Sequence, residues 1–86
     1  MTMWTTGEIV ELPTAMAEGT IQFADGVSAS RIIDTFDADK NFIKEHANVS
    51  SVTFDSTVKY YAVAENIVQI PNNSQKTNLA LYVNIR

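Results

Sequence analysis

Alternation of apolar and polar residues predicts β-strand near both ends of the chain. In residues 79–86 (LALYVNIR) every second residue is aliphatic, as a strand with one buried side requires. Two shorter runs also favour strand: residues 7–12, closed by Pro13, and residues 20–23. The second run leads into Asp25-Gly26, a strong turn signal because glycine accepts a positive φ without penalty.

Between residues 28 and 48 the spacing of apolar residues changes. Ile32, Phe36 and Ile43 recur near every third or fourth position, which is typical of an amphipathic helix. One continuous helix would place Asp39 on the apolar side. The pattern therefore predicts a helix that is broken near residues 37–41.

Residues 51–70 fit two descriptions. Apolar residues share one face at a period of two, but residues 60–68 also satisfy a helical template. The β-branched and aromatic composition favours strands, with bends near residues 55–56 and 65–66. The predicted fold class is therefore α+β: a small antiparallel sheet of four to five strands, with one helix, straight or broken, packed on one face. We expect residues 1–86 to form a single domain.

Composition narrows the functional classes. The chain has 86 residues, 45% of them hydrophobic, and a formal charge of −4 with acids and bases scattered. The six Lys and Arg residues form no cluster, so direct binding of nucleic acid is not expected. No apolar run approaches the roughly 20 residues that span a bilayer, and no signal peptide is visible. We expect a cytoplasmic protein that binds no membrane and needs no cofactor.

Catalytic motifs are not found either. The chain has no cysteine and a single histidine, His46, whereas zinc catalysis normally takes several His or Cys ligands. No G-x-S-x-G sequence marks a nucleophilic serine. The three glycines are too far apart to form a phosphate-binding loop. We therefore expect a protein that is not an enzyme.

The stretch DADKNF, residues 37–42, resembles the opening of a calcium loop. Asp37, Asp39 and Asn41 occupy its first, third and fifth positions. The sixth position is Phe42 rather than glycine, and the twelfth is Asn48 rather than a bidentate glutamate. A helix break with solvated acids is the preferred interpretation. Weak cation binding by the acidic segment, which includes Asp34, is the alternative.

Aromatic residues are candidates for a contact surface, because they are the commonest anchors of protein interfaces. If Tyr60 faces the core, its neighbour Tyr61 faces outward, and Tyr82 lies opposite the aliphatic face of its own strand. Together with Trp4, Tyr61 and Tyr82 would form an outer face of the sheet that binds another protein. The other interpretation, that a helix or the N-terminal segment covers them, stays open.

These observations predict a small non-catalytic module that binds another protein, including a second copy of itself as a homo-oligomer. A sheet edge near the C-terminal strand suits such pairing. By analogy of size and composition alone, it suits an accessory, assembly or inhibitor protein of phage type. The alternative is a domain for a small ligand or a divalent cation, which would use residues 34–41 or a tyrosine-lined pocket.

Overall fold

The structure, a computed structural model, describes residues 2–6, 8–68 and 83–86, and the side chains of residues 8–65 and 83–86. In this part of the chain every regular element is a strand, and no helix there is long and apolar enough to cross a membrane. The strands are β1 (Thr2–Thr6), β2 (Val10–Glu11), β3 (Gly19–Phe23), β4 (Arg31–Phe36), β5 (Phe42–Ala47), β6 (Ser51–Phe54), β7 (Tyr60–Val68) and β8 (Val83–Ile85).

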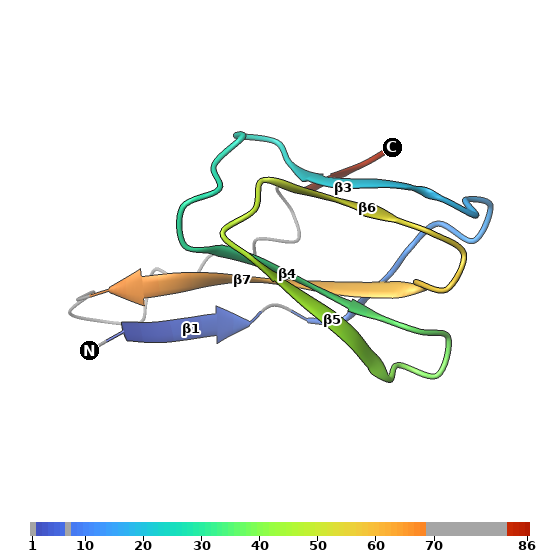
Figure 1. Ribbon diagram of the computed structural model, residues 1–86, viewed down its shortest axis with the longest axis horizontal. Helices are drawn as coiled ribbons and strands as arrows, with labels where there is room; N and C mark the ends of the chain where they lie inside the picture. The colour runs from blue at the N-terminus through green and yellow to red at the C-terminus, as the bar shows by residue number, and fades with distance from the viewer. Residues whose placement is uncertain (1, 7, 69–82) are drawn as a thin grey trace.

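The described strands form two antiparallel sheets, which lie one above the other in Figure 1. The larger sheet has the order β1-β7-β4-β5, and β2 pairs with β7 beside β1. The smaller sheet has the order β6-β3-β8. The chain passes from the smaller to the larger sheet between β3 and β4, and it returns between β5 and β6.

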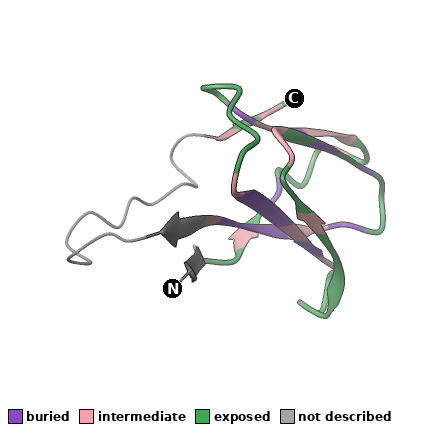
Figure 2. Ribbon diagram, turned by 60° about the vertical axis from the view of Figure 1, so that its left-hand side comes forward, coloured by how far each residue is buried: buried purple, intermediate pink, exposed green. Residues whose placement is uncertain are grey.

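The core lies between the sheets. Ile33 of β4 and both Tyr61 and Val63 of β7 are buried against Ile21 and Phe23 of β3, so buried residues concentrate in these central strands (Figure 2). The other buried members of the cluster are Leu12, Val52, Phe54 and Val58. Odd-numbered residues of β4 and β7 therefore face the core. Even-numbered residues point to the opposite side, which we call the outer face of the larger sheet.

The predicted helix over residues 28–48 is wrong, because this segment forms β4, a hairpin loop and β5. Ile32 and Ile33 are both buried, so β4 lacks the alternation that marks a strand with one wet side. The apparent helical spacing arises because a loop over residues 37–41 separates two strands. The α+β fold class is corrected accordingly: the described chain is all-β, with two antiparallel sheets and no helix packed on them.

The remaining segments follow the sequence more closely. Residues 19–23 and 60–68 are strands, which also excludes the alternative helix over residues 60–68. The Asp25-Gly26 signal is a turn, with Gly26 at a φ of 69° and its amide bonded to the Phe23 carbonyl at 3.0 Å.

Two strand predictions need adjustment, and a third is tested only in part. The bend expected near residues 65–66 is not found, because β7 continues to Val68. Of the described residues 8–12, only Val10 and Glu11 are in strand, in β2. The C-terminal strand is described for residues 83–85, and residues 79–82 of the predicted run lie outside the described part.

Candidate protein-binding face

The β4–β5 hairpin loop is organised by Asp37. Its Oδ1 atom accepts hydrogen bonds from the amides of Asp39 and Asn41, both at 2.9 Å. The Asp37 amide donates to the Asn41 carbonyl at 3.0 Å, and Lys40 adopts a positive φ of 64°. The backbone hydrogen bond from Asn41, with smaller help from Asp39, lowers the pKa of Asp37. DADKNF is therefore a hairpin turn, and not the helix break that the sequence predicted.

The loop does not gather ligands as a calcium loop does. The Asp37 oxygen is directed at backbone amides, while Asp34 lies on β4 outside the loop. Among the residues that the structure describes, no three His, Cys, Asp or Glu side chains lie together in a group that could hold a metal ion. The geometry of Asp34, Asp37, Asp39 and Asn41 thus adds no support to the cation alternative.

A row of aromatic side chains crosses the outer face of the larger sheet. Strand register places Phe42 of β5 opposite Phe36 of β4, and Phe36 opposite Tyr60 of β7. The rings of Phe36 and Phe42 meet edge to face, with centroids 6.1 Å apart. The Lys40 ammonium lies 5.3 Å from the centroid of Tyr60. We call Phe36, Phe42 and Tyr60 the aromatic row.

The aromatic row is open to solvent at the edge strand. Phe42 is 59% exposed, and its neighbour Ile43 is also exposed. Phe36 and Tyr60 are half-buried. An exposed phenylalanine on a sheet edge costs free energy unless it is covered by another surface, so the row has the properties of a contact surface.

Two carboxylates lie beside the aromatic row on the same face. Asp34 of β4 is directly opposite Glu45 of β5, and like charges in such a pair destabilise a sheet. Burial, and after it the charge of Glu45, raises the pKa of Asp34. The Oδ1 atom of Asp34 is buried and has no hydrogen-bond partner among the residues that the structure describes. Within the described part of the chain, this pair is therefore electrostatically unsatisfied.

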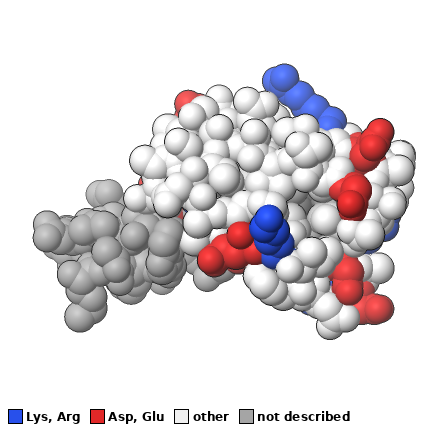
Figure 3. Space-filling view, in the orientation of Figure 1, with Lys and Arg blue, Asp and Glu red and all other residues white. Residues whose placement is uncertain are grey.

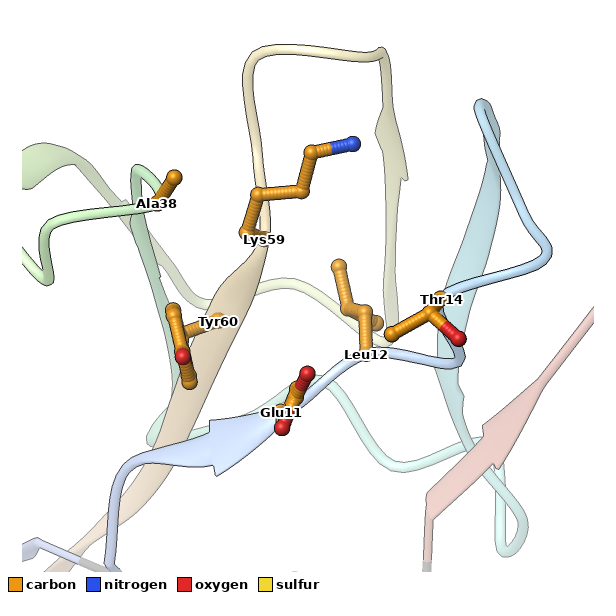
Figure 4. A pocket seen from close by; sticks show the side chains of 6 residues that line it. All are labelled: Glu11, Leu12, Thr14, Ala38, Lys59 and Tyr60. Carbon is orange, nitrogen blue, oxygen red and sulfur yellow. The ribbon is translucent and has the colours of Figure 1, made fainter.

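A shallow hollow of about 220 Å³ lies at the other end of the aromatic row (Figure 4). Glu11 of β2 is opposite Tyr60 in the strand register, and Leu12, Thr14, Ala38 and Lys59 complete the lining. The side chains of Glu11 and Lys59 provide opposite charges around an apolar floor. Tyr60 is the tyrosine in this lining, and the tyrosine-lined pocket of the sequence-based alternative stays a prediction.

Of the three aromatic interface candidates from the sequence, the structure tests only Tyr61. Tyr61 is only 4% exposed and belongs to the core, and burial raises its pKa. Its predicted outward position is therefore wrong. Trp4 lies in β1 opposite Asn66, but its side chain is outside what the structure describes, and Tyr82 lies outside the described residues.

The structure also shows a buried arginine that sequence reasoning missed. The Arg31 guanidinium lies 4.8 Å from the ring centroid of Phe23, and its Nη2 atom pairs with Asp25 at 3.0 Å. The Nε atom of Arg31 is 3.8 Å from Glu65. These contacts join β3, β4 and β7 at one end of the core, so we assign Arg31 a structural role.

His46 has no catalytic surroundings in the described residues. It lies on the edge strand β5, opposite Ile33. Burial, followed by the charge of Lys44, lowers its pKa. Among the described residues, no side-chain hydrogen bond joins His46 to a serine, threonine or carboxylate.

The chain matches no protein-family model, no curated protein and no solved structure.

Proposed function

We propose that this protein is a non-catalytic module that binds another protein through the aromatic row and the carboxylate pair beside it. The observation that supports the proposal most directly is the exposure of Phe42, held by Phe36 on an edge strand. Aromatic residues dominate the binding energy of protein interfaces, because they offer large, stiff surfaces at low entropic cost. The row spans three strands of one sheet, so its geometry is rigid before a partner arrives.

The charges beside the row indicate the chemistry of the partner. Asp34 and Glu45 repel one another, and the whole chain carries a charge of −4. An arginine or lysine of the partner would neutralise the carboxylate pair while its aliphatic part lies on Phe36. Electrostatic complementarity of this kind raises the association rate and excludes acidic competitors. We therefore propose a partner with a basic and apolar contact segment.

The experiment compares two variants that remove exposed apolar side chains from different places. Phe42→Ser removes the exposed end of the aromatic row. Val27→Ser is the matched control, because Val27 is 40% exposed in the connection between β3 and β4, away from the row. Partners are captured from the native host with the wild-type chain, identified, purified and titrated by calorimetry.

We expect Phe42→Ser to weaken binding of the purified partner by about tenfold or more, as truncation of a hot-spot aromatic does. Val27→Ser should leave the affinity unchanged. Equal affinities for wild type and Phe42→Ser would overturn the proposal.

A second candidate function is favoured by the hollow beside Tyr60. Its volume of about 220 Å³ is below the range of drug-sized sites, so it suits a ligand of a few heavy atoms. Glu11 and Lys59 would bind the two ends of a small zwitterion. Amide NMR spectra recorded with free amino acids would test this function; shifts confined to the hollow, and lost in Tyr60→Ala, would favour it over protein binding.

We also propose that the chain self-associates, as the sequence led us to expect. Within the described residues β5, β6 and β8 each pair on one side only, so each has an edge available to a second copy. Cytoplasmic localisation and a role as a phage-type accessory protein stay predictions from the sequence.

A further inference from the structure

The edge of β5 is protected against pairing with itself. Its register with β4 is interrupted between Thr35 and Phe36, and bulges of this kind twist an edge away from a new strand. Its middle residues are Lys44 and Glu45. If β5 of one copy paired antiparallel with β5 of a second copy, about a two-fold axis at the middle of the strand, Lys44 would lie opposite Lys44 or Glu45 opposite Glu45. Like charges directly opposite one another destabilise a sheet.

The edge of β6 has none of these features. Its sequence, SVTF, contains no charge and no proline, and all four residues pair with β3 in an uninterrupted register. β-Branched and aromatic residues make it a good strand former. Where β6 runs in Figure 1, the same view in Figure 3 shows a largely uncharged surface. β6 thus lacks the features that protect β5, and no described strand pairs with its second edge.

Hydrogen bonding within the smaller sheet shows which backbone groups of β6 remain available. The Phe23 amide donates to the Ser50 carbonyl at 2.9 Å. Because bonded and non-bonded pairs alternate along an antiparallel ladder, the backbone groups of Val52 and Phe54 also point toward β3. The backbone amide and carbonyl groups of Ser51 and Thr53 point away from β3, to the edge of β6 with which no described strand pairs. A second strand can bond to these two residues without disturbing the existing ladder.

We infer that a second copy of this chain pairs antiparallel with the free edge of β6, about a two-fold axis at Val52. The inference rests on the self-association part of the proposed function. In this register Val52 of one copy lies opposite Val52 of the other. Ser51 of each copy lies opposite Thr53 of the other, which gives one Ser51–Thr53 pair on each side of the axis. Each Ser51–Thr53 pair exchanges its backbone hydrogen bonds, about four bonds in total. The two smaller sheets become one continuous sheet.

Side chains agree with this register. A two-fold axis normal to the sheet keeps matching faces together, so Val52 meets Val52 on the core side. The small hydroxyl side chains of Ser51 and Thr53 meet on the other side, where both residues are exposed. Moving the axis to Thr53 would place Asp55 within the pairing, opposite Ser51. The contact is short, so we expect weak association, in the range of about 10 µM to 1 mM.

The test uses charge pairs at the two outward-facing residues. The variant Ser51→Lys with Thr53→Lys places lysine opposite lysine in both cross-strand pairs. The variant Ser51→Glu with Thr53→Glu does the same with glutamate. Both positions are exposed, and circular dichroism and thermal unfolding check that each variant folds. Sedimentation equilibrium is run from about 10 µM to about 1 mM, the range of the expected dissociation constant.

We expect wild type to dimerise over this range, both charged variants to be monomeric, and their equimolar mixture to dimerise at least as tightly as wild type. The control carries Lys44→Glu and Glu45→Lys on β5, and its dimer should match that of wild type. A wild-type chain that stays monomeric, a dimer that survives in the lysine variant, or a mixture that fails to associate would overturn the inference.

The result is separable from partner binding through the aromatic row. Phe42→Ser should dimerise normally, and the lysine variant on β6 should bind the captured partner normally. Failure of the β6 pairing therefore leaves the aromatic row untouched, and failure of the aromatic row leaves the β6 pairing untouched.

Discussion

At the scale of single residues, two adjacent tyrosines divide the larger sheet into its two faces. Alternation along a strand requires Tyr60 and Tyr61 to point in opposite directions, and this could be predicted from the sequence. Which of them points inward could not be predicted from polarity alone, because both are aromatic. Side-chain volume contains the missing signal: Tyr61 alternates with the bulky Val63, whereas Tyr60 alternates with Ala62 and Ala64.

The two tyrosines should differ strongly in their contribution to stability. Tyr61→Ala leaves a cavity in the core and should cost about 3–5 kcal/mol, as large aromatic truncations do. Tyr60→Ala removes a half-exposed side chain and should cost less than about 1 kcal/mol. Urea unfolding of both variants measures the difference. Similar losses for the two would contradict the assignment of faces.

The carboxylate pair beside the aromatic row should reduce stability at neutral pH. The folded-state pKa of Asp34 is raised above its ordinary value of 3.8, so the folded protein disfavours its ionised form. Stability from this group is therefore present at low pH and lost as the pH rises through the folded-state pKa. Asp34→Asn should then raise the free energy of unfolding at pH 7 by about 0.2–1 kcal/mol.

The same substitution should have little effect at pH 3, where Asp34 is protonated in both states. Asp39→Asn, in the exposed hairpin loop, is the control for the removal of one negative charge. The measurement is urea unfolding at both pH values. A loss of stability in Asp34→Asn at pH 7 would show that the carboxylate is already satisfied.

At the scale of elements, the segment Arg31–Phe36 shows why the helix prediction was wrong. Consecutive buried residues in a strand are difficult to distinguish from one side of a helix by periodicity. Two signals favoured the strand: the β-branched residues Ile32, Ile33 and Thr35, and the Asp37–Asn41 loop, whose Asp and Asn side chains suit turns. The candidate site was missed for the same reason, since Phe36 and Phe42 come together only when this segment is a hairpin.

Gly19 should be essential for docking β8 against β3. A Cβ atom at this position would collide with the Arg86 carbonyl oxygen and would lie 2.9 Å from Cζ of Phe54. The Arg86 carbonyl accepts the Thr20 amide at 2.8 Å, so it cannot move without losing that bond. Gly19→Ala should therefore speed hydrogen exchange of the Thr20 and Arg86 amides by at least about tenfold.

Gly26→Ala is the matched control for this substitution. Its Cβ would meet no atom within 4 Å, but its φ of 69° makes alanine strained, at a cost of about 1 kcal/mol. It should lower overall stability without selective exposure of β8. If Gly19→Ala leaves exchange at Thr20 and Arg86 as slow as in the control, the close approach of β8 to Gly19 is incorrect.

At the scale of the whole molecule, the two sheets leave different surfaces for different contacts. The larger sheet presents the aromatic row and the carboxylate pair on its outer face, and the smaller sheet presents the uncharged edge of β6. Composition predicts a protein without an evident catalytic group, and this stays a prediction. The positions of these surfaces depend on strand register and on which strands lie at the edges, and residue spacing along one chain does not determine either.

The most direct test of the central claim is a map of the partner's contacts on the folded chain. Amide chemical shifts of the isotope-labelled protein are recorded while the purified partner is added. We predict that the largest changes occur at Phe36, Phe42, Glu45 and Tyr60, across β4, β5 and β7. Changes confined to β3 and β8, with these four amides unmoved, would contradict the account.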